Sequence, residues 1–131
     1  MKTCATFILL FVLAIPLPAQ SQGHESIDSW LNGCQANAVD LMQEEMCYNM
    51  AFSKWIDYQT QLLQQLETVA PESRMSILTQ SQEAWEAFLD GEQQRLWTLY
   101  PGPEDQIMTA AILMAYSRVR ALFLESHLAE Y

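Results

Sequence analysis

The feature that most constrains this chain is a long stretch, Cys34 to Ala70, that contains neither glycine nor proline. From Leu41 to Val69 its apolar residues recur mostly at intervals of three or four, a spacing that places their side chains on one face of an α-helix. Asp40 and Gln43 fit a capping box at the N-terminal end. The pattern therefore predicts one amphipathic helix of about 28 residues, roughly 42 Å long.

Two more long helices are expected after this one. Pro71 suits the first position of a helix, and the apolar residues that follow from 75 to 97 form a near-heptad series. The breaker Tyr100–Pro103 ends that helix, and a third begins at Pro103 and is apolar on nearly all sides from 107 to 116. We predict an all-α fold of three long helices, either an up-down-up bundle or an antiparallel hairpin with the third helix packed across it.

The N-terminus has the pattern of a secretory signal peptide over residues 1–19. Lys2 precedes an apolar run from Ala5 to Ile15, which two prolines and Ala19 follow. The run is too short to span a bilayer, which needs about 20 residues. We expect cleavage after Ala19 or Ser21 and a periplasmic or secreted protein with no stable membrane anchor, an uncleaved anchor being the alternative.

The segment after the signal is predicted to be a flexible leader over residues 20–29, followed by a helical domain over 30–131. Cys34 and Cys47 remain as an even pair in an exported chain, which predicts one disulfide. On a single helix these residues would lie roughly 20 Å apart, whereas a bridge needs Cα atoms within about 7 Å. The chain must therefore turn near Asp40, so that Trp30–Ala38 folds back over the first turns of the long helix.

The charge narrows the choice of partner. Loss of Lys2 with the signal leaves five basic and sixteen acidic side chains, a net charge of −11. Nucleic acid and anionic membranes would be repelled, whereas a cationic protein would be attracted. The alternative is that the acidity only keeps a small exported protein soluble. The oligomeric state is left open.

The sequence contains no pattern typical of a catalytic site. It has no Gly-rich phosphate loop, no HExxH and no CxxC, and His127 stands close to the end of the sequence. We expect no enzymatic activity and no cofactor.

Three methionines, Met42, Met46 and Met50, recur at every fourth position. Core packing is the preferred interpretation, and a soft-metal site for Cu(I) is the alternative, because thioethers bind that ion. Four aromatic residues at helical spacing are also expected in the core: Trp55, Trp85, Phe88 and Trp97.

Two arginines, Arg118 and Arg120, lie within an apolar helix. A basic group near a core usually has a carboxylate partner, and Asp57 and Asp90 are mid-helix candidates. We predict structural ion pairs that hold the helices in register. The alternative is an arginine that receives a ligand carboxylate.

Three motifs follow one another in the chain. The first spans Cys34 to Asp57, the central one spans Leu78 to Asp90 and contains Gln82 and Trp85, and the last spans Ser117 to Leu124. Their order and spacing resemble the lysozyme-inhibitor LprI-like N-terminal domain family of small exported bacterial helical domains. The chain departs from the family at Leu89, where an arginine is usual, and at Gln93 and Ile112, where a second cysteine pair is common.

The resemblance implies a soluble envelope protein with a Cys34–Cys47 disulfide, with Asp90 and Arg120 as framework polar residues and with no catalytic residue. Some members of the family inhibit lysozyme.

We therefore expect a non-enzymatic, exported, acidic binding protein, a candidate lysozyme inhibitor, that takes a cationic partner such as lysozyme. Tyr100, Glu104 and Asp105 form the exposed loop expected to enter the partner's cleft. One alternative is a structural or assembly module of the cell envelope that docks through the apolar third helix. The other is a Cu(I) carrier that uses the methionine stripe.

Overall fold

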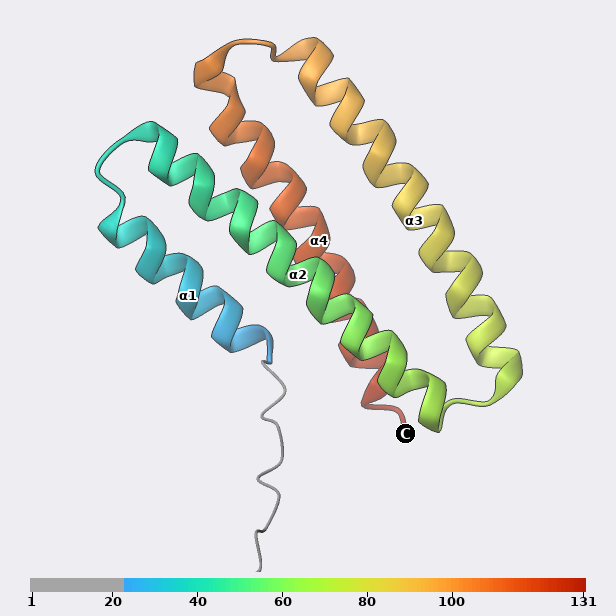
Figure 1. The fold of residues 1–131 in the computed structure, drawn as a ribbon. Helices are drawn as coiled ribbons and strands as arrows, with labels where there is room; N and C mark the ends of the chain where they lie inside the picture. The colour runs from blue at the N-terminus through green and yellow to red at the C-terminus, as the bar shows by residue number, and fades with distance from the viewer. Residues whose placement is uncertain (1–22) are drawn as a thin grey trace, which may run out of the picture.

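The computed structural model describes residues 23–131 as four helices joined by short connections. They are α1 (His24–Asn37), α2 (Leu41–Val69), α3 (Glu72–Leu99) and α4 (Gln106–Leu128), with a 3₁₀ turn, η1 (Pro103–Asp105), before α4. α2 and α4 run in the same direction, and α1 and α3 run opposite to them (Figure 1). The all-α prediction is confirmed, with a fourth, shorter helix added at the N-terminal side. The predicted signal peptide at 1–19 and the first residues of the predicted leader lie outside the described residues.

The long α2 begins and ends where its sequence predicts. The backbone N–H of Gln43 donates to Asp40 Oδ1 at 2.8 Å, and the Gln43 side chain accepts from the N–H of Val39 at 3.1 Å. The first bond satisfies a donor that the first helical turn leaves unpaired, and the second ties Gln43 back to the residue before the N-cap. The helix then runs for 29 residues, up to the break before Pro71.

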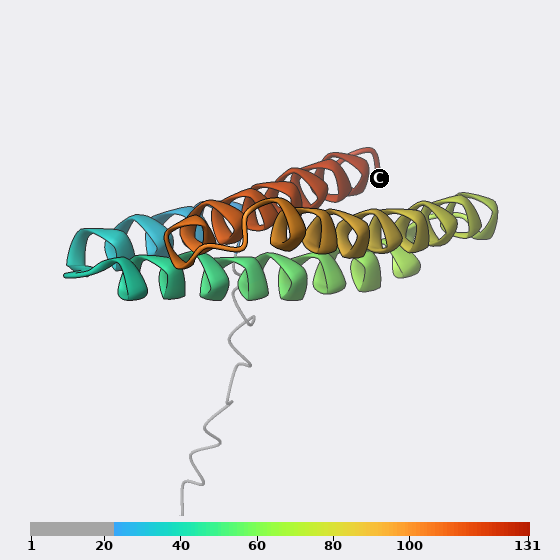
Figure 2. The same ribbon diagram turned by 90° about the horizontal axis from the view of Figure 1, so that it is seen from above.

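The core lies where α1, α2 and α4 meet. α2 and α4 form the most extensive helix pair, and α1 packs on α2; the view from above separates α2 from α4, which overlap in the first view (Figure 2). Fully buried side chains in this core include Ala51, Trp55, Leu66, Ala121 and Leu124. The segment Pro103–Leu128 is long and apolar enough to cross a membrane by composition alone. Part of this segment lies in the core shared with α2, where Ala110, Ala121 and Leu124 are buried.

α3 is much less covered than its sequence predicts. It packs more on α4 than on α2, and Leu78 and Leu96 are its buried side chains. Trp55 lies in the core as predicted and Trp85 is half-buried, but the core prediction is wrong for Phe88 and Trp97, which are 47% and 57% exposed. Helical spacing shows which side chains share a face, but burial needs a neighbouring element against that face.

The N-terminal side of the domain also differs from the prediction. Residues 24–29, expected in a flexible leader, form the first turns of α1. Ile27 and Leu31, one helical turn apart, are buried in the core, and this packing holds a segment whose polar composition suggested a loop. The disulfide is present, with the Cα atoms of Cys34 and Cys47 5.8 Å apart. As predicted, the chain turns before α2 and α1 folds back along it.

Candidate functional site

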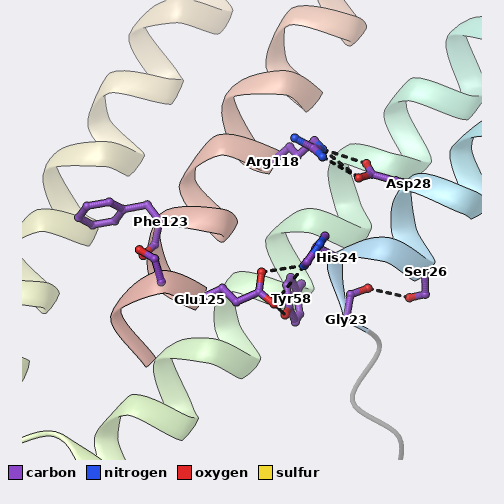
Figure 3. A network of polar contacts seen from close by, with 9 residues as sticks. Gly23, His24, Ser26, Asp28, Tyr58, Arg118, Phe123 and Glu125 are labelled. Atoms are coloured by element: carbon purple, nitrogen blue, oxygen red, sulfur yellow. Dashed lines mark hydrogen bonds and ion pairs between the residues drawn. The ribbon is translucent and has the colours of Figure 1, made fainter. Parts of the chain in front are cut away.

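A polar network joins α1 to α4 through Arg118 (Figure 3). The Arg118 guanidinium donates to Asp28 from Nη2 at 2.7 Å and from Nε at 2.9 Å. The predicted partners Asp57 and Asp90 are exposed instead, so that pairing is wrong. The physical reason is that α1 occupies the flank of α4 and brings its own carboxylate within reach. Arg118 thus has the structural ion-pair role that was predicted, with a different partner.

Glu125 of α4 forms a second, separate set of polar contacts nearby. It accepts a hydrogen bond from the Tyr58 hydroxyl at 3.1 Å, and His24 Nδ1 lies 2.8 Å from its Oε2 (Figure 3). Burial, and then the nearby negative charge of Glu125, raise the pKa of Tyr58 to about 12. The three residues come from α1, α2 and α4, so this network fastens the three helices of the core to one another.

Arg120 is buried without the predicted carboxylate. Only 8% of the residue is exposed, and its guanidinium donates to Gln82 Oε1 at 3.0 Å and to Ser81 Oγ at 3.1 Å. Its Nη2 atom is buried and makes no hydrogen bond within residues 23–131. Burial lowers the pKa of Arg120, although Glu86 opposes that shift. The predicted ion pair is wrong here because the α3 side chains that hydrogen-bond to the guanidinium are the neutral Gln82 and Ser81.

Gln82, singled out from the central motif, connects three helices. Besides accepting from Arg120, its Nε2 donates to Gln59 Oε1 at 3.4 Å, and Gln59 Nε2 donates to the Ser117 carbonyl at 2.9 Å. Trp85, the other residue of that motif, lines a cavity of about 220 Å³ between α2 and α3, together with Gln82 and Asp90. Both residues therefore lie at the α2–α3 boundary, where they position α3.

Apolar and acidic side chains meet at the end of the molecule where α2 and α4 begin. They line a cavity of about 440 Å³, which we call the acidic groove; its lining is Leu41, Met42, Glu45, Pro103, Glu104 and Ile107. Leu41 and Met42 are 64% and 72% exposed, so large apolar surface stands beside two carboxylates. No basic side chain belongs to the lining among the residues that the structure describes.

The methionine stripe runs down α2 from this groove. Met42, Met46 and Met50 are all exposed, so the preferred core interpretation is wrong. The reason is that α1 and α4 cover other faces of α2. The Cu(I) alternative stays a prediction; in the part of the chain from Gly23 on, no cluster of three His, Cys, Asp or Glu residues is arranged to hold a metal ion.

The structure separates the three residues predicted in the partner-binding loop. Glu104 lines the acidic groove, while Tyr100 lines a smaller cavity of about 130 Å³ that shares Glu45 with the groove. Asp105 lines neither cavity and is half-buried before α4. Sequence reasoning missed the groove's α2 side, although the exposed apolar Leu41 directly after an N-cap was a signal for it.

Comparison with known proteins finds no matching family model, no matching curated protein and no matching solved structure.

Proposed function

We propose that this chain is a non-enzymatic, exported binding protein that captures a cationic protein through the acidic groove. The observation that carries the proposal is the juxtaposition of exposed Leu41 and Met42 with Glu45 and Glu104 around one cavity. The apolar side chains supply area to bury on binding, and methionine adapts its shape to different partners. The carboxylates select a positively charged surface and raise the rate of encounter with it.

A basic lysozyme is the specific partner that we propose. The chain has sixteen acidic and six basic side chains, so the fields of the two proteins attract each other at long range. The resemblance to LprI-like domains supports the same partner. Inhibition would follow if Glu104 and Tyr100 lie against the lysozyme cleft when the groove binds.

The test is turnover of cell-wall substrate by hen-type lysozyme at low salt, with and without the purified mature protein. We expect inhibition at near-stoichiometric ratios that fades as salt is added, because screening weakens the attraction. The variant E45Q/E104Q should slow association about three- to tenfold. The matched control is E67Q/E72Q, which removes the same charge from exposed positions at the other end of α2 and at the start of α3.

The possible outcomes test the identity of the partner and the role of the acidic groove separately. No inhibition at large excess would reject lysozyme as the partner. Inhibition that E45Q/E104Q and E67Q/E72Q weaken equally would reject the groove, since only net charge would then matter. Loss of affinity in Met42→Ser through faster dissociation would support the apolar contribution.

A second candidate function rests on the outer face of α4. Met108 and Val119 are exposed along it, which fits an envelope assembly module that docks by this helix. Sedimentation at micromolar concentration should then show a mass above the monomer, and Val119→Lys should reduce it. A monomer for both proteins would reject self-association.

A further inference from the structure

A fourth cavity, at the end of the molecule opposite the acidic groove, is lined by hydrogen-bond donors instead of carboxylates. It measures about 240 Å³ and lies between the start of α3 and the end of α4; its lining is Arg74, Ile77, Leu78, Ser81, Phe123, His127 and Tyr131. We call it the donor pocket, because its polar side chains can all donate hydrogen bonds.

The donor pocket has no carboxylate side chain in its lining, within the range 23–131, although acidic side chains outnumber basic ones by sixteen to six in the chain. Glu130 pairs with two of the pocket's side chains from outside the lining: it lies 4.0 Å from Arg74 and 3.2 Å from His127, and its side chain is 52% exposed. An exposed pair of this kind contributes little. The pocket therefore offers positive charge and hydrogen-bond donors to an anion.

Arg120 adds a further positive charge next to the pocket, although it is not part of the lining. Its guanidinium contacts two lining side chains: Nη1 donates to Ser81 Oγ at 3.1 Å, and its central carbon lies 5.2 Å from the centre of the Phe123 ring. Because the Ser81 oxygen accepts from a cation, its own proton is free to be donated into the cavity. The buried charge of Arg120 has only neutral hydrogen-bond partners in the described chain, so an anion bound to Ser81 would stabilise it.

The apolar side chains of the lining indicate the chemistry of the ligand's uncharged part. Ile77, Leu78 and Phe123 would enclose a hydrocarbon or aromatic body, while Arg74, Ser81 and His127 would supply the donors for a charged head. The volume lies below the roughly 300 Å³ at which pockets for drug-sized ligands begin. We propose that the donor pocket binds a small carboxylate with an apolar body, the carboxylate being held by Arg74 and Ser81 and Arg120 acting as a positioning residue through Ser81. This proposal does not depend on the acidic groove.

The experiment is an amide NMR titration of the mature protein with 3-phenylpropionate, with 3-phenyl-1-propanol as the neutral counterpart. We expect saturable shifts at Ser81, Phe123 and His127, with a dissociation constant below about 1 mM. The alcohol should bind about tenfold more weakly or worse, because it cannot pair with the guanidinium groups. Added salt should weaken the acid and leave the alcohol unchanged.

Three variants test the assignments of residues. Arg74→Gln and Ser81→Ala should each weaken the acid about three- to tenfold, while Arg95→Gln, an exposed arginine near the other end of α3, should not. Arg120→Met should lower the ratio of acid to alcohol affinity, a readout that a purely structural role would leave unchanged. If Arg120→Met does not fold, the affinities of Arg74→Gln and Ser81→Ala for the acid test the proposed site.

The proposal is overturned if neither probe binds at about 10 mM, if acid and alcohol bind equally, or if Arg74→Gln and Arg95→Gln behave alike. Shifts that saturate at residues outside the donor pocket would also overturn it.

Discussion

α2 and α3 have nearly the same length, 29 and 28 residues, yet α2 buries seven side chains and α3 two. Both helices carry apolar residues at helical spacing, so the difference does not come from composition alone. α2 has α1 against one flank and α4 along its length, whereas α3 packs on its neighbours mainly along the side that meets α4 (Figure 1). An apolar face is buried only as far as the topology provides a second surface for it.

The weaker packing of α3 has a consequence for binding. α3 contributes to the donor pocket, to the cavity at Trp85 and to the cavity at Tyr100. Cavities form beside α3 because its contacts with the core are concentrated at Leu78, Leu96 and the Gln82–Arg120 hydrogen bond. Three of the four cavities therefore lie beside α3, whereas the acidic groove lies where α2 and α4 begin.

The largest expected difference between the two helices is in stability. Trp55→Ala on α2 removes a fully buried ring and should cost about 3–5 kcal/mol of unfolding free energy. Phe88→Ala on α3 removes a half-exposed ring that packs on Tyr116 and should cost about 1 kcal/mol. Urea denaturation of both variants measures this, and equal losses would show that α3 is covered in solution.

The disulfide belongs to the tightly packed side of the molecule. Replacing both cysteines, C34S/C47S, should cost about 3 kcal/mol, mainly because the unfolded chain gains freedom. We expect the amides of α1 and of the start of α2 to exchange hydrogen faster, with α3 little changed, in a hydrogen-exchange experiment on the folded protein. Faster exchange centred on α3 would contradict the division into a tightly packed core of α1, α2 and α4 and a more loosely packed α3.

Alkaline pH should loosen the core through Tyr58. Its folded pKa of about 12 exceeds the ordinary 10.0, so the stability it contributes is complete below pH 10 and is lost as the pH rises toward 12. The loss amounts to the order of 2 kcal/mol. Unfolding of Tyr58→Phe across this range is the measurement, and the part of the alkaline loss due to Tyr58 should disappear; an unchanged pH profile would reject this role.

The smallest expected change in stability comes from breaking single ion pairs, one on α1 and one on α3. Asp28→Asn breaks the two-pronged bridge to Arg118 across α1 and α4 and should cost about 1 kcal/mol, since the pair is partly exposed. Glu130→Gln breaks the exposed 4.0 Å pair with Arg74 of α3 and should have an effect close to zero. A reversed order in thermal unfolding would contradict the assignment of α1 to the core.

Local chemistry determined much of the fold. The capping pair at Asp40, the uninterrupted helical spacing to Val69, the breaks at Pro71 and at Tyr100–Pro103, and the disulfide were all readable from neighbouring residues. Each depends on contacts a few positions apart or, for the disulfide, on the limited reach of a bridge. The N-terminal helix was missed because Ile27 is the one strongly apolar residue before Trp30 in that segment.

Only the tertiary structure decided which surfaces are exposed and which charges meet. Arg118 pairs with Asp28, ninety residues away, and the acidic groove joins Leu41 to Glu104, while Arg120 meets Gln82 rather than a carboxylate. By itself the sequence determined an acidic, disulfide-bonded set of amphipathic helices. How those helices pack depends on contacts between residues that are distant in the sequence. Each such contact is weak alone, and only their sum favours one arrangement, which local spacing does not specify.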